Sequence, residues 1–197
     1  MKIRTTFLLP VLVMLFAAGA ACAGQREATG FYMKGSFSEH EGDLERAYAF
    51  YSRALTLDPD DPEIIFALAR VTSDLGKVEE AAAYASQIKD ESSIGGRAKL
   101  LLAELHYRSG EVGEAVSLFE DVKDAEGVPN FEIHKLLARI YLELEDTGKA
   151  RRTLEEARDI YPGDLYVNYR LGFIYAEAGE TRMAIESFRA AVEANPS

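Results

Sequence analysis

Histidine is the residue of this chain best suited to metal binding or to acid–base chemistry, and it occurs three times, as His40, His106 and His134. Zinc sites need closely spaced His, Cys or carboxylate ligands, and a catalytic histidine must lie near a group that it serves. No H-E-x-x-H pattern occurs, the chain has one cysteine, and the nearest two histidines are 28 residues apart. The serines lie in no nucleophile elbow. The sequence therefore predicts no metal site, no cofactor and no enzymatic activity, and His106 and His134 are expected to be packing residues.

The elements that would position any site follow a repeating pattern. Gly42, Gly76 and Gly110 are 34 residues apart, and each is followed five positions later by an alanine. With one inserted residue the pattern continues through Glu145 and Gly179. The pattern predicts one helical hairpin repeated five times, from about residue 28 to residue 197.

Each recurring position of the repeat has a physical role within the hairpin. Glycine takes the left-handed conformation at low cost, so it can end the first helix. A small residue seven positions before each turn lets two helices cross closely; these residues are Gly35, Ala69, Ala103, Ala138 and Gly172. Glu145 replaces the turn glycine in the fourth hairpin, and there we expect a different local geometry, with Asp146 or Thr147 capping the next helix.

The stretch from Gly42 to Pro59 and the stretch from Leu171 to Pro196 resemble tetratricopeptide repeats (TPR). This resemblance implies an all-α fold, a right-handed α-solenoid of five helix-turn-helix hairpins. The five tandem units are expected at about residues 28–61, 62–95, 96–129, 131–164 and 165–197. The resemblance also implies a concave groove lined by the first helix of each unit.

The N-terminus differs from the repeats. Lys2 and Arg4 precede an apolar run over residues 7–16, which is followed by small residues up to Ala23. This order is typical of an export signal peptide, here residues 1–22, with residues 23–27 as a short linker. A retained transmembrane helix is the other interpretation. The apolar core of ten residues is short of the roughly 20 needed to span a bilayer.

Cys22, the only cysteine, lies in this N-terminal region. Residues 19–22 resemble the end of a bacterial lipoprotein signal, in which the cysteine is lipidated, except that Gly19 stands where a leucine is usual. Ordinary cleavage after Ala23 would instead remove Cys22 with the signal. Both interpretations predict an exported protein, located in the periplasm or anchored as a lipoprotein that faces the periplasm.

The net charge of −11 limits the class of partner. Phosphate binding depends on basic charge, so nucleic acid and anionic membrane surfaces are not expected as partners. Contact with a membrane is expected only through an N-terminal lipid.

The residues six, nine and ten positions before each turn are predicted to point into the groove. The residues chosen from them, with the rim position Arg97, mix aromatic, apolar and basic side chains: Tyr32, Phe66, Arg70, Arg97, Leu101, Lys135, Arg139, Tyr169, Arg170 and Phe173. Such a groove suits a protein or peptide that carries acidic residues. The other interpretation is that about half of the apolar residues pack against neighbouring hairpins. Of the asparagines and basic residues that form the family's carboxylate clamp, at most one, Arg97 or Arg170, is present in any three adjacent units, so the clamp is not expected.

The predicted function is that of a non-enzymatic scaffold at the cell envelope, which binds a peptide or protein partner during assembly of an envelope, secretion or pilus complex. The alternative is a structural protein that self-associates through its last hairpin. Ile185, Phe188 and Val192 recur there at helical spacing, and some of them should face outward. This alternative predicts a homo-oligomer.

Overall fold

The computed structural model describes the backbone of residues 8–193 and the side chains of residues 24–193. The described residues form ten helices and no strand, which confirms the predicted all-α hairpin array. The helices are α1 (Leu8–His40), α2 (Leu44–Leu57), α3 (Pro62–Asp74), α4 (Val78–Ala85), α5 (Gly95–Arg108), α6 (Val112–Val122), α7 (Asn130–Glu143), α8 (Thr147–Ile160), α9 (Leu165–Glu177) and α10 (Thr181–Glu193). The expected linker of residues 23–27 is part of α1.

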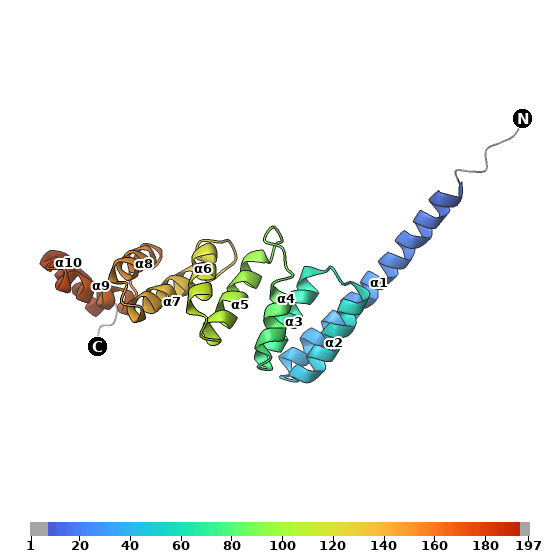
Figure 1. The fold of residues 1–197 in the computed structure, drawn as a ribbon, viewed down its shortest axis with the longest axis horizontal. Helices are drawn as coiled ribbons and strands as arrows, with labels where there is room; N and C mark the ends of the chain where they lie inside the picture. Colours follow the sequence, from blue (N-terminus) through green and yellow to red (C-terminus); the bar gives the residue numbers. More distant parts are fainter. Residues whose placement is uncertain (1–7, 194–197) are drawn as a thin grey trace, which may run out of the picture. The chain divides into compact units, whose positions relative to one another are not determined.

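The chain divides into two compact units, Met1–Leu101 and Leu102–Ser197. In the first unit α1 packs on α2 and α3 packs on α4; in the second, α7 packs on α8 and α9 on α10 (Figure 1). Helices α5 and α6 are joined by the same kind of short turn, at Gly110. Each packed pair is the antiparallel hairpin that the repeat predicts.

The turns of the hairpins share one backbone geometry. Gly42, Gly76, Gly110 and Gly179 have φ between 73° and 81°, in the left-handed region that glycine favours. Glu145 has φ 59°, so it takes the same conformation, and the expectation of a different geometry there was wrong. The backbone N–H after the turn residue closes the same hydrogen bond in both cases, from Asp146 to Tyr141 O and from Glu180 to Tyr175 O, each 2.8 Å long.

Asp146 caps α8, as expected, because its side chain accepts a hydrogen bond of 3.0 Å from the Lys149 N–H. Asp43, Asp61 and Asp164 cap α2, α3 and α9 in the same way. The starts of these four helices are therefore specified by aspartate side chains.

The small residues before the turns allow close packing, as predicted. A Cβ atom on Gly35 would lie 2.6 Å from the Tyr51 ring, and one on Gly172 would lie 2.6 Å from the Phe188 ring. Ala69 is fully buried. The aromatic rings of the second helices therefore lie directly on the first helices.

Each unit has its own hydrophobic core. In the first unit, Tyr51 of α2 packs with Leu68 and Val71 of α3. In the second unit, Leu154 of α8 packs with Leu171 and Tyr175 of α9. The cores thus join successive hairpins, as expected of repeats that cannot bury their apolar faces alone.

Candidate functional site

One concave feature of the second unit lies between α7 and α9, which are the first helices of two successive hairpins. It is a cavity of about 510 Å³ lined by Glu132, Lys135, Leu136, Arg139 and Tyr166. Lys135 and Arg139, two of the predicted groove residues, therefore line one cavity.

The two basic side chains of this cavity are in different electrostatic states. The Lys135 ammonium lies 3.4 Å from a carboxylate oxygen of Asp164 and 3.6 Å from one of Glu132, so its charge is balanced. Arg139 is exposed, and within residues 24–193 no carboxylate pairs with it. Arg139 therefore presents an uncompensated positive charge at the cavity.

Arg170, on α9, adds a second exposed cation. Its guanidinium carbon lies 5.4 Å from the centre of the Tyr166 ring, and none of the described carboxylates forms an ion pair with it. The Tyr166 hydroxyl is buried and has no hydrogen-bond partner in the described part of the chain. A bound group that accepts a hydrogen bond from this hydroxyl would offset the cost of leaving it buried without a partner, which is about 1–3 kcal/mol.

An exposed aromatic group continues the same helix face. Tyr169 and Phe173 are 47% and 45% exposed, and their ring centres are 4.7 Å apart in an edge-to-face arrangement. The Phe188 ring of α10 lies 5.3 Å from Phe173. We call Tyr169, Phe173 and Phe188 the aromatic ledge; its rings offer apolar area at low entropic cost.

The predicted groove residues of the first unit are mostly engaged within the chain. Arg70 forms an ion pair with Glu39, which also accepts a hydrogen bond of 2.7 Å from the Tyr51 hydroxyl. Phe66 is only 6% exposed, and Arg97 covers its ring at 4.7 Å.

Tyr32 and Leu101 are half-buried. The Tyr32 ring lies 5.4 Å from Tyr51, and burial together with the Glu63 carboxylate raises its pKa. Leu101 packs on the cluster that contains Ile65 and Ile88. Packing therefore accounts for Phe66 and Leu101, whereas the exposed Arg139, Tyr169, Arg170 and Phe173 of the second unit are displayed to solvent.

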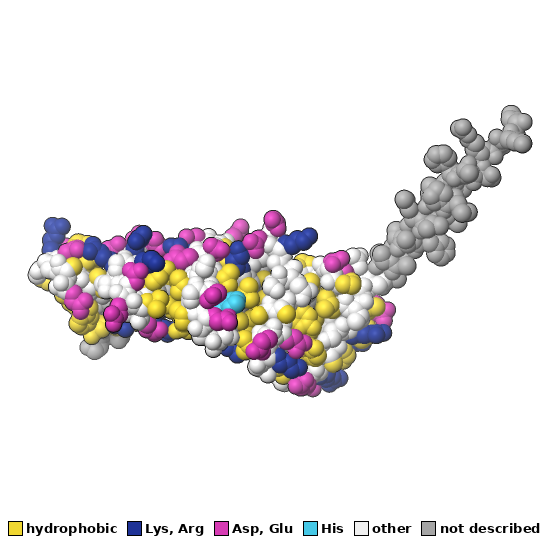
Figure 2. All heavy atoms as spheres, in the orientation of Figure 1, with side chains coloured by type: hydrophobic (Ala, Val, Ile, Leu, Met, Phe, Trp, Pro, Cys, Tyr) yellow, Lys and Arg dark blue, Asp and Glu magenta, His cyan; other side chains and the backbone are white. Residues whose placement is uncertain are grey.

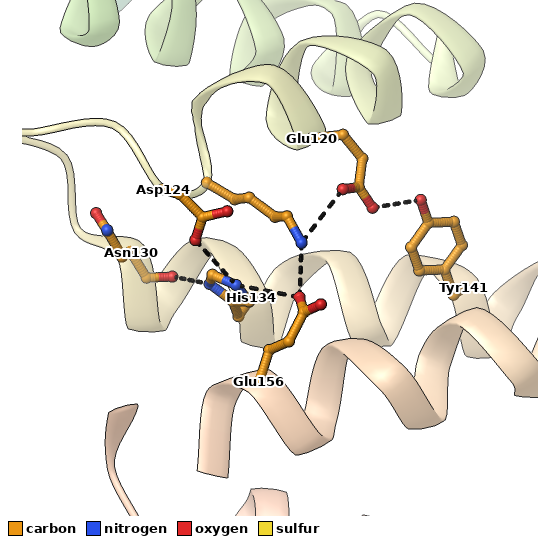
Figure 3. Close-up of polar contacts among 7 residues, drawn as sticks. Glu120, Asp124, Asn130, His134, Tyr141 and Glu156 are labelled. Atoms are coloured by element: carbon orange, nitrogen blue, oxygen red, sulfur yellow. Dashed lines mark hydrogen bonds and ion pairs between the residues drawn. The ribbon is translucent and has the colours of Figure 1, made fainter. Parts of the chain in front are cut away.

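A polar network at the junction of α6, α7 and α8 was not foreseen (Figure 3). The Lys123 ammonium lies 2.6 Å from Glu156 and 3.5 Å from Glu120, and the Tyr141 hydroxyl donates to Glu120 at 2.7 Å. Burial, followed by the hydrogen bond to Glu120, raises the pKa of Tyr141. The 33-residue spacing between Lys123 and Glu156, close to one repeat, is the only signal that the sequence offered.

His134 belongs to the same network and is buried, 1% exposed. Its Nδ1 lies 2.7 Å from the Asn130 carbonyl, which can only accept, so Nδ1 carries the proton (Figure 3). Its Nε2 faces Glu156 at 3.4 Å. His106 pairs with Glu111 of the neighbouring turn. Residues 24–193 contain no group of His, Cys, Asp and Glu arranged to hold a metal ion.

The surface shown in Figure 2 has acidic and basic side chains mixed rather than separated by sign. The side chain of Cys22 lies outside the described residues. Within the described part of the chain, no helix combines the length and apolarity needed to cross a membrane.

Comparison with known proteins shows two matches to a family described as Tetratricopeptide repeat, at residues 40–93 and 135–197. Together they span more than half of the 197 residues. Among related sequences, cellulose synthase operon protein C of Xanthomonas axonopodis pv. citri is 27% identical over 73% of this chain, and TPR repeat-containing protein YpiA of Bacillus subtilis is 28% identical over 79%. The chain spans only 10% and 37% of the lengths of these two relatives.

Solved structures share the fold at low sequence identity. The crystal structure of MamA has a TM-score of 0.67 at 21% identity, covering 81% of this chain and 93% of that one. YrrB, described as a TPR protein with an unusual peptide-binding site, has a TM-score of 0.64 at 17% identity, with coverages of 85% and 86%. PilF of Pseudomonas aeruginosa has a TM-score of 0.65 at 16% identity, with coverages of 88% and 79%. These likenesses concern the fold alone.

Proposed function

The chain belongs to the tetratricopeptide repeat family, and from this premise we propose that its second unit binds a protein segment carrying acidic and aromatic or apolar side chains. Repeats of this family generally bind protein or peptide partners, which is consistent with a non-enzymatic, protein-binding role. The observation that carries the finer proposal is the pair of unpaired cations, Arg139 and Arg170, beside the cavity and the aromatic ledge.

The contact chemistry follows from these side chains. A carboxylate of the partner pairs with Arg139 or Arg170, because neither guanidinium has a carboxylate partner within residues 24–193. An aromatic or apolar side chain of the partner packs on Tyr169 and Phe173, which are each nearly half exposed. Arg70 does not offer the same contact because Glu39 already neutralises it.

The test uses fluorescent ten-residue peptides in which two aspartates flank one phenylalanine, with matched peptides in which asparagine or lysine replaces aspartate. We expect Arg139→Glu and Arg170→Glu each to weaken binding of the aspartate peptide by about 1–3 kcal/mol. Arg182→Glu is the matched control, since the Arg182 side chain is 87% exposed on α10 and, among the residues that the structure describes, pairs only with Glu186 of its own helix. Equal binding of aspartate and lysine peptides would exclude the proposal.

We further propose that the protein is exported and acts in assembly of an envelope, secretion or pilus complex. The order of Lys2, Arg4, the apolar run over residues 7–16 and Cys22 supports this proposal. If Cys22 is lipidated, Cys22→Ser releases the protein from the membrane fraction. Mass spectrometry of the mature N-terminus decides the point, because a free amine on Gly24 excludes lipidation.

Self-association through α10 is the second candidate function. Ile185 and Val192 are 54% and 70% exposed on α10, which is the observation in its favour. Light scattering on the purified chain tests it: a monomer at tens of micromolar would refute self-association.

A further inference from the structure

The first hairpin carries an exposed patch that is basic and aromatic together. A cavity of about 450 Å³ between α1 and α2 is lined by Met33, Lys34, Phe37, Ser38, Arg46 and Phe50. Met33 and Phe37 are 66% and 62% exposed, although both are large apolar side chains. We call this surface, with the neighbouring Arg53, the first-hairpin face.

The repeat shows what kind of element belongs on this face. Phe37 lies five residues before the turn at Gly42, and the residues five before the later turns include Val71, Ile140 and Ile174. Those three are at most 6% exposed. Val71 packs with Ala47 and Tyr51 of the preceding hairpin, so this position receives the second helix of the element before it. In the first hairpin none of the described residues covers it.

The charges of the first-hairpin face differ from those of the later junctions. Lys34 stands where Leu68, Leu137 and Leu171 are fully buried. Its ammonium lies over the Phe31 ring at 5.0 Å, and Arg46 lies over Phe50 at 5.6 Å.

Arg53 completes the set of cations. It lies 5.9 Å from the centre of the Phe31 ring. Lys34, Arg46 and Arg53 have no ion pair with a carboxylate in the part of the chain that the structure describes. The face therefore combines three uncompensated cations with the exposed Phe37 ring and the half-buried rings of Phe31 and Phe50, in a protein of net charge −11.

The junction between α6 and the next hairpin indicates where the missing carboxylates belong. There Glu120, ten residues after its turn, lines a cavity with Lys149, which occupies the place of Arg46. Lys123, the C-cap residue of α6, pairs with Glu156, whose place in the first hairpin is taken by Arg53. An element on the first-hairpin face therefore needs carboxylates at both the Glu120 and the Lys123 positions.

A second copy of the chain does not meet this need. Its last helix, α10, has Arg189 at the position of Glu120, ten residues after Gly179. Stacking α10 on α1 and α2 in the spacing of the array would bring Arg189 against Arg46, which is a repulsion between like charges.

We propose that the first-hairpin face binds an amphipathic helix of a different polypeptide, one that presents apolar residues to Phe37 and Phe50 and carboxylates to Arg46 and Arg53. The helix takes the place that a preceding hairpin's second helix has at the later junctions. This surface is separate from the acidic-peptide site proposed for the second unit.

The probe is a lactam-stapled helical peptide with the sequence of residues 111–125, which include α6, and with the substitution Lys123→Glu. The matched control peptide keeps Lys123 and carries Glu120→Lys. We expect the full chain to bind the probe at least tenfold more tightly than the control by fluorescence anisotropy. Arg46→Glu combined with Arg53→Glu reverses that preference, whereas Arg26→Glu, elsewhere on α1, leaves it unchanged. A photo-crosslinking residue at Met33 locates the bound probe.

Several results would overturn the proposal. One is that the chain fails to bind a probe that circular dichroism shows to be helical, and another is that it binds both peptides with equal affinity. A third is that the preference for the probe persists in the variant that carries both Arg46→Glu and Arg53→Glu. Each of these results would contradict the proposal. Sedimentation showing self-association that Phe37→Asp abolishes would assign the face to a second copy. Binding to vesicles of seven parts phosphatidylcholine to three parts phosphatidylglycerol, lost in the charge-reversal variant, would assign it to a lipid surface. None of these outcomes depends on Arg139 or Arg170, so the two proposals fail separately.

Discussion

The turn at Glu145 offers the sharpest test of how the hairpins are stabilised. Glu145 has φ 59°, and a non-glycine residue in this left-handed region costs about 1–2 kcal/mol. Glycine avoids that cost but loses about 0.5–1 kcal/mol more in chain entropy on folding. Glu145→Gly is therefore expected to raise the free energy of unfolding of the second unit by about 0.5–1 kcal/mol.

The side chain of Glu145 contributes little stability that the substitution by glycine would remove. It is exposed, and no ion pair involves it within residues 24–193. The matched control is Gly179→Ala at the next turn, where φ is 73° and an added Cβ would meet no atom within 4 Å. Because the same two contributions, backbone strain and chain entropy, change there in the opposite sense, this control should lower stability by about the amount that Glu145→Gly adds.

Urea unfolding followed by circular dichroism measures both variants. With a slope of about 2 kcal/mol per molar urea, the midpoints should move by roughly 0.3–0.5 M in opposite directions. A lower midpoint for Glu145→Gly would refute the strain argument, because it would mean that Glu145 stabilises the turn through contacts with its side chain.

Two further predictions concern packing and pH. Gly35→Ala should destabilise the chain by about 1–2 kcal/mol, and Gly172→Ala by less. The methyl group added at Gly35 would clash with the base of the buried Tyr51 ring, whereas the one added at Gly172 would meet the half-exposed Phe188 ring. Equal urea midpoints for the two variants would contradict this prediction. Burial raises the pKa of Glu155, but hydrogen bonds, first from Tyr175, outweigh it and leave the pKa lowered. The resulting stability is present above the ordinary glutamate pKa and is lost as pH falls through the lowered value, so Tyr175→Phe should lose less stability than the parent between about pH 5 and pH 3.

The hairpin array could be predicted from the sequence because its causes are local. A glycine at the turn, a small residue seven positions earlier and an apolar spacing near 3.6 each act within one hairpin. Glu145 was mispredicted for the same reason. The residue type at the turn suggested another geometry, whereas the hydrogen bond from Asp146 to Tyr141 O and the packing of both helices impose the left-handed conformation.

The candidate site could be predicted only in part, because the exposure and the pairing of a side chain depend on residues that are far away in the sequence. Arg70 and Arg139 both lie six residues before a turn. Arg70 is neutralised by Glu39, 31 residues earlier, whereas Arg139 has no such partner in the described part of the chain. Phe66 and Phe173 likewise share a predicted role, yet one is 6% and the other 45% exposed. Periodicity gives the face of the helix but not the neighbour that covers it.

The junctions between hairpins show why the sign of a charge at a given repeat position carries information that hydrophobic spacing lacks. Ten residues after the turn, Glu120 and Glu155 accept hydrogen bonds from Tyr141 and Tyr175 of the next hairpin, each 2.7 Å long. The last hairpin has Arg189 at this position. A carboxylate there joins the third hairpin to the fourth and the fourth to the fifth, whereas Ser52 and Ser86 stand at this position in the first two hairpins. The same reasoning, applied to the uncompensated cations of the first hairpin, indicates that an acidic helix from elsewhere belongs on that face.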